Sequence, residues 1–73
     1  LDPSYVGARL HLALILLEQG NTQGAREQYE EALTWNRNSL GAHEGLANIL
    51  REAGEREKAE EHRKKAEALR YAR

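Results

Sequence analysis

The sequence predicts an all-α protein built from two antiparallel helical hairpins. The helix formers Leu, Ala, Glu, Arg and Lys dominate it, whereas valine, isoleucine and threonine, which favour strands, are scarce. Apolar residues recur at spacings of three and four, which is typical of helices. Residues 6–39 and 40–73 also match at eleven positions without a gap. The chain of 73 residues therefore reads as five leading residues followed by two copies of one unit.

The first unit is expected to hold two helices. Asp2 can cap the first helix, which Pro3 opens and which runs to about 17–19, where Gly20 and Asn21 stop it. Thr22 is predicted to cap the second helix. Its apolar stripe consists of Ala25, Tyr29, Ala32, Leu33 and, at its end, Trp35.

The second unit repeats this plan after turn and cap residues at 36–39. Gly54 is predicted to end the third helix, and the fourth runs from about Arg56 to Leu69 or beyond. The third helix has an apolar stripe of Ala42, Leu46, Ala47, Ile49 and Leu50. Each unit is therefore a helix, a glycine turn and a second helix.

This pattern resembles the tetratricopeptide repeat, whose unit has 34 residues with W-x2-L-G-x2-Y in its first helix and A-x3-F, then P, later. The matching positions are Leu12-Ala13, Leu16, Ala25-x3-Tyr29 and Ala32 in the first unit, and Leu46-Ala47, Leu50, Ala59 and Ala66 in the second. The resemblance implies a right-handed α-solenoid. The sequence departs from the family pattern at the tryptophan position (Arg9, His43), at the proline position (Arg37, Tyr71) and at the second aromatic position (Arg63).

The resemblance divides the chain into residues 1–5, as the end of a preceding repeat, and repeats at 6–39 and 40–73. The first helix is apolar on nearly every side, which predicts a further neighbour: a preceding repeat, a bound partner or a second copy of the chain. The last helix is rich in interleaved acidic and basic residues, which favours a polar cap that keeps a repeat array soluble. The alternative for this helix is a docking surface for an acidic partner.

By the same resemblance, the chain is a protein–protein interaction module that binds a peptide or partner protein in a groove lined by the first helix of each repeat. The groove residues would be Leu10, Leu14, Leu17, Glu18, Glu44, Asn48, Arg51 and Glu52. Asn48 could pair with a peptide backbone and Arg51 could hold a carboxylate. The alternatives are packing of the three leucines on another repeat or chain, and an ordinary solvated face for the polar residues. At the level of the whole chain, the rival functions are homo-oligomerisation through the first helix and a docking or regulatory segment of a larger enzyme.

Composition argues against several other classes. A net charge of −1 and a pI near 6.3 disfavour a nucleic-acid binder, and no apolar run is long enough to span a membrane. Cysteine is absent, which excludes disulfides and thiolate metal sites and fits the cytoplasm, the periplasm or an exported location alike. His11, His43 and His62 are too dispersed to predict a metal site. Neither a phosphate-binding loop nor a nucleophile with its base is recognisable, so no cofactor and no enzymatic activity are expected.

Overall fold

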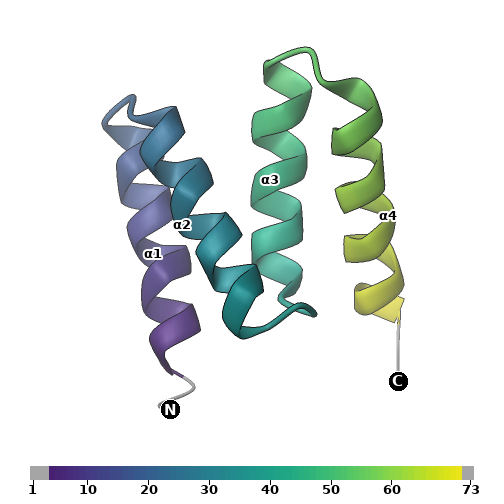
Figure 1. Cartoon of the computed structure of the whole chain (residues 1–73), viewed down its shortest axis with the longest axis horizontal. Helices are drawn as coiled ribbons and strands as arrows, with labels where there is room; N and C mark the ends of the chain where they lie inside the picture. Colours follow the sequence, from purple (N-terminus) through teal and green to yellow (C-terminus); the bar gives the residue numbers. More distant parts are fainter. Residues whose placement is uncertain (1–3, 72–73) are drawn as a thin grey trace.

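Four helices follow one another in the computed structural model, which describes residues 4–71. They are α1 (Ser4–Glu18), α2 (Thr22–Trp35), α3 (Leu40–Glu52) and α4 (Arg56–Tyr71). Figure 1 shows two antiparallel hairpins, α1–α2 and α3–α4, set side by side, and the packing between them is mainly that of α2 on α3. The predicted all-α architecture of two hairpins is confirmed. The predicted cap Asp2 and the predicted first helical residue Pro3 lie outside the described residues.

The two hairpin turns are alike because their sequences repeat. Gly20 and Gly54 have φ values of 80° and 84°, a left-handed conformation that glycine adopts without steric cost. In the first turn Asn21 N donates to the Leu16 carbonyl at 2.8 Å, and in the second Glu55 N donates to the Leu50 carbonyl at 2.9 Å. These bonds satisfy carbonyls that the helix ends would otherwise leave unpaired, which confirms both predicted stop signals.

Two of the predicted caps have different outcomes. Ser39 caps α3 as expected, since its hydroxyl accepts a hydrogen bond from Ala42 N at 3.3 Å. The prediction that Thr22 caps α2 is wrong, because the cap is Asn21, whose side-chain oxygen accepts from Gly24 N at 2.9 Å. Asn21 directly follows the left-handed Gly20, so the chain enters α2 one residue earlier than expected.

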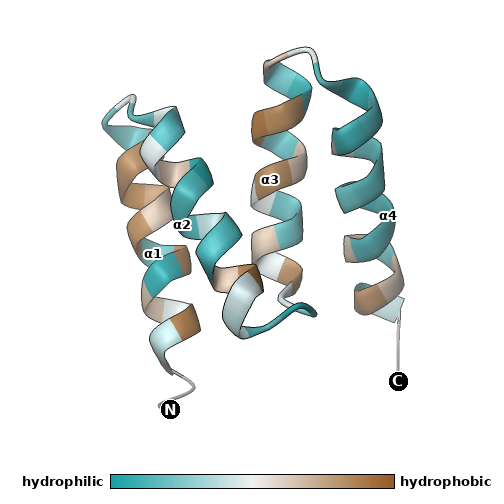
Figure 2. Cartoon of the chain, viewed as in Figure 1, coloured by the Kyte–Doolittle hydropathy of each residue, from teal (hydrophilic) through white to brown (hydrophobic). Residues whose placement is uncertain are grey.

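Small residues bring the helices of the core together. Ala13, Ala25, Ala32 and Ala42 are completely buried, and Leu46 is the largest side chain that is almost completely enclosed. Tyr29 lies buried between the hairpins, whereas Trp35 is half exposed and packs edge-on against Tyr5 with ring centroids 6.1 Å apart. Figure 2 shows that brown, apolar residues concentrate on α1 and α3, while α4 is largely teal. The core thus lies along both hairpins, with α4 contributing mainly Ala59 and Ala66.

A polar pair also repeats within each hairpin, 34 residues apart. Arg9 of α1 donates to the Gln28 side chain of α2 at 3.2 Å, and His43 of α3 meets His62 of α4 at 2.9 Å. Arg9 also pairs with Glu31 at 2.8 Å and lies over the Tyr5 ring. The positions that resemble the tryptophan position of the repeat therefore hold polar side chains that connect the two helices of a hairpin.

Candidate functional site

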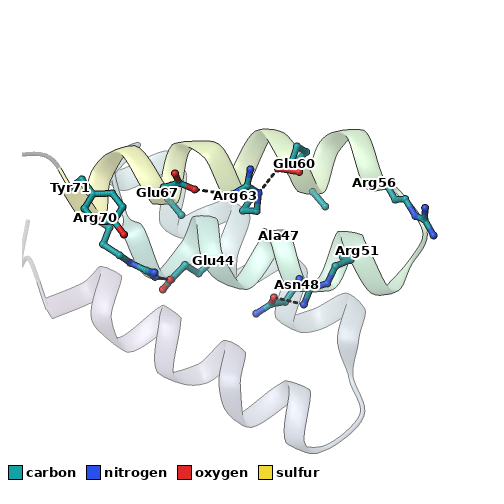
Figure 3. Close-up of a pocket in the computed structure, with 12 residues that line it drawn as sticks. Glu44, Ala47, Asn48, Arg51, Arg56, Glu60, Arg63, Glu67, Arg70 and Tyr71 are labelled. Atoms are coloured by element: carbon teal, nitrogen blue, oxygen red, sulfur yellow. Dashed lines mark hydrogen bonds and ion pairs between the residues drawn. The ribbon is translucent and has the colours of Figure 1, made fainter.

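An open groove of about 890 Å³ runs between α3 and α4. Its floor is formed by Ala47, Ala59 and Ala66, which have little exposed surface. Because alanine side chains are short, the charged residues on both sides stand above this floor, as Figure 3 shows. The rim is formed by Glu44, Asn48 and Arg51 of α3, and by Arg56, Glu60, Arg63, Glu67, Arg70 and Tyr71 of α4.

Several of the charges on the rim are already paired. Arg63 bridges Glu60 and Glu67 along α4, with 2.8 Å to the Glu67 carboxylate, and Arg70 joins Glu44 across the groove. The hydrogen bond to Glu60 and the charge of that carboxylate raise the pKa of Arg63. These side chains are about half exposed, so each pair adds little stability, but together they hold one end of the groove in a defined arrangement.

The other end of the groove offers free hydrogen-bond donors. Arg51 donates one N–H to the Asn48 oxygen at 3.0 Å, which orients the guanidinium and leaves most of its five donors unused in this contact. The Asn48 amide group also keeps its two N–H donors, and Arg56 lies further along the rim. This arrangement can accept a carboxylate or the carbonyl oxygens of an extended backbone.

The structure distributes the eight predicted groove residues over two environments. Glu44, Asn48 and Arg51 line the groove, and Glu52 is exposed beside them. Leu14 and Glu18 are exposed on α1, with Leu14 showing 53% of its surface. Leu10 and Leu17 are half-buried and pack against the core.

Helix geometry explains why the three leucines separate. At about 100° per residue, Leu17 lies only about 20° from Leu10 around the helix, whereas Leu14 lies about 60° from Leu17. Leu10 reaches α3, where a Cβ on Gly41 would lie 3.0 Å from its Cδ1 atom. A spacing of four and three therefore placed an interface residue and a surface residue in the same predicted set.

The groove corresponds, 34 residues on, to the surface of the first hairpin against which α3 packs. Leu10, Leu17, Tyr29 and Leu33 of the first hairpin are buried or half-buried there. The equivalent residues of the second hairpin are Glu44, Arg51, Arg63 and Glu67, all on the groove rim. The alanines of the floor are retained, so the second hairpin keeps the shape of a helix-binding surface but lines it with charge.

Two histidines that are distant in the sequence meet between α3 and α4. The buried His43 lies with Nε2 at 2.8 Å from the Arg37 carbonyl oxygen and Nδ1 at 2.9 Å from His62 Nδ1. A carbonyl can only accept, so His43 Nε2 carries the proton and, in the neutral ring, Nδ1 accepts from His62 Nδ1. The sequence analysis missed this pair, although positions 43 and 62 are the repeat equivalents of 9 and 28.

The histidine pair is best described as a hydrogen-bonded packing contact. Burial lowers the pKa of His62, and His43 and Lys65 lower it further, while Glu61 and Glu30 act in the opposite direction. Among residues 4–71 there is no cluster of three or more histidines, cysteines or acids that could hold a metal ion. Within the same range, no helix has the length and apolar character needed to cross a membrane.

A comparison with protein-family models relates this geometry to known proteins. The model described as Tetratricopeptide repeat matches residues 16–68, which is 53 of the 73 residues and spans α2, α3 and most of α4. Comparisons with curated proteins and with solved structures found no significant match.

Proposed function

Because the chain belongs to the tetratricopeptide repeat family, whose members generally mediate protein–protein interactions without catalysis, we propose that it is a non-enzymatic module that binds a protein segment. The segment would lie along the exposed side of α3, beside the α3–α4 groove. This surface includes Asn48 and Arg51, the polar residues that the sequence analysis placed in the groove. The exposed Leu14 of α1 would supply an apolar contact next to them.

The observation that carries this proposal is the unused donor capacity of Arg51 and Asn48. Arg63 and Arg70 already bind carboxylates of the chain itself, whereas Arg51 is held by a neutral amide oxygen. An incoming carboxylate would thus meet a positioned guanidinium without first breaking an ion pair. A segment that carries Asp or Glu is therefore the expected ligand.

The alanine floor supports binding of an extended backbone. Ala47, Ala59 and Ala66 leave space between the helices, so a peptide could approach the helix surfaces closely. Asn48 offers two donors for carbonyl oxygens of that peptide. The charged rim would keep the site hydrated, which favours a moderate and reversible affinity over a permanent complex.

Selection from a random peptide library against the whole chain tests the proposal. We expect enrichment of peptides with acidic residues, and amide chemical shifts on binding that change around residues 48 and 51. Replacing Arg51 with Ala should weaken such a peptide by about tenfold, since a hydrogen bond to a charged group contributes about 1.5–3 kcal/mol. Lys58→Ala is the matched control, because Lys58 is an exposed cation of α4 that pairs with Glu55 and does not line the groove. Equal losses for both variants, or shifts confined to α2, would contradict the proposal.

A further inference from the structure

The outer face of α1 is the repeat equivalent of the α3 face that α2 covers. Leu46 and Ile49 of α3 are buried at that interface, with 2% and 5% of their surface exposed. Their equivalents in α1, Leu12 and Ile15, are 42% and 39% exposed. Leu12 was expected to fill gaps between helices by its resemblance to the repeat, and the structure instead places it on this open face. The same pattern of apolar residues is therefore covered once and left open once.

Two glycines of α3 receive side chains of the first hairpin. Leu10 lies against Gly41, where its Cδ1 atom would be 3.0 Å from an added Cβ. The Tyr29 ring lies directly on Gly45, where an added Cβ would collide with the ring carbons. Glycine at both positions lets the first hairpin approach α3 closely, so these two sites determine which side chains the neighbouring hairpin carries.

The face of α1 retains one of these two glycines. Gly7 is the equivalent of Gly41, and an added Cβ there would have nothing within 4 Å, so the site is open. His11 is the equivalent of Gly45 and is exposed. A neighbour that docks on α1 as the first hairpin docks on α3 would find space opposite Gly7 but an imidazole where its aromatic ring should lie.

We propose that the exposed face of α1, formed by Gly7, Ala8, Leu12 and Ile15, binds a helical hairpin of the same repeat type, joined in front of α1 in the same polypeptide. This hairpin carries an apolar side chain opposite Gly7 and a small, non-aromatic one opposite His11. The inference rests on the α2–α3 interface within the chain and is independent of the proposed peptide site.

A second copy of the chain fits this face poorly. Head-to-tail stacking would place the α3–α4 face of one molecule on α1 of the next. The residues opposite Gly7 and His11 would then be Glu44 and Arg63, both of which are ion-paired on a charged rim. Covering Leu12 and Ile15 with these groups would require their desolvation, which is costly for charges that are not matched by the facing surface.

The proposal can be tested by adding a hairpin in the register that the repeat defines. A copy of residues 6–39 is placed directly in front of residue 6, so that its Tyr29 faces position 11 of the original chain. The experiment compares H11G with the matched control H11A, in the 73-residue chain and in the extended chain. Urea unfolding followed by circular dichroism gives the midpoint and the m-value, which increases with the surface buried.

The expected result is a reversal of order. In the 73-residue chain H11A should be more stable than H11G, because alanine is the better helix former. In the extended chain H11G should be the more stable, since glycine alone accepts the tyrosine ring of the added hairpin. Retaining His11 and changing Tyr29 to Ala in the added copy should also restore docking, with a single transition of higher m-value, and L12E should abolish it.

Other outcomes overturn the inference. If H11A remains more stable than H11G in the extended chain, the added hairpin does not dock in the α2–α3 manner. If the unfolding midpoint of the 73-residue chain rises with protein concentration and L12E removes that rise, a second copy covers this face instead. Neither outcome involves Arg51, so failure here is distinguishable from failure of the proposed peptide site.

Discussion

The contact between Gly45 and Tyr29 should show a strong energetic coupling. Tyr29 is buried between the hairpins, and its ring occupies the space that a side chain at position 45 would need. Gly45→Ala therefore has two opposing effects on the free energy of unfolding. It improves the helix propensity of α3 by about 1 kcal/mol, and it overpacks the interface at a cost of about 1–3 kcal/mol.

Removing the ring should change the sign of the Gly45→Ala effect. In the chain with Tyr29, we expect a net loss of stability of up to about 2 kcal/mol. In a Tyr29→Ala background the methyl group meets no ring, so the same substitution should stabilise the protein by about 1 kcal/mol. The coupling between the two positions is then about 1–3 kcal/mol, within the range found for residues in contact.

A double-mutant cycle measures this coupling. The four chains are unfolded with urea at one fixed concentration of trimethylamine N-oxide, an osmolyte that keeps the weakest variant folded at the start of the titration. Circular dichroism at 222 nm, or about that wavelength, follows the loss of helix. If Gly45→Ala stabilises both backgrounds equally, the ring does not occupy this space and the described hairpin contact is refuted.

Three further predictions concern single sites. The pKa of His62 is lowered by burial and by His43, so the folded chain binds fewer protons than the unfolded chain; stability should be full above about pH 6.5, the unfolded value, and should fall as the pH drops below it, and His62→Asn should reduce this slope in urea titrations. Ser39→Ala removes the cap of α3 and should lower the free energy of unfolding by about 1 kcal/mol in thermal or urea melts, whereas Ser39→Asp should retain most of it. Gly54→Ala should cost about 1–2 kcal/mol because φ is 84°, while Gly7→Ala, at an open helical position, should stabilise the chain; a gain at both sites would contradict the left-handed turn.

The sequence predicted the helices well because each has local signals. Gly20, Gly54 and Ser39 act through bonds to neighbours a few residues away, so their roles follow from residue type and position alone. The one incorrect cap, Thr22 in place of Asn21, arose where two adjacent residues can both accept a hydrogen bond. The geometry of the preceding left-handed glycine decides between them, and this geometry is not visible in residue types.

The site was harder to predict because it depends on rotation about helix axes and on contacts between helices. The spacing of Leu10, Leu14 and Leu17 indicates one broad face, but α3 covers only part of it. The contact between His43 and His62 joins residues 19 positions apart on different helices, and spacing rules within one helix do not detect it. Applying the 34-residue register to polar as well as apolar residues would have indicated both that contact and the charged groove.

The packing of each helix on its neighbours along the sequence also bears on how the chain folds. Contacts are extensive within α1–α2 and within α3–α4, less extensive between α2 and α3, and weak between α1 and the second hairpin. Such local contacts give a low contact order, which is associated with folding in microseconds to milliseconds. Each hairpin can form without waiting for a distant part of the chain, and the interface around Tyr29 and Gly45 then determines whether the two hairpins unfold as one cooperative unit or in two steps.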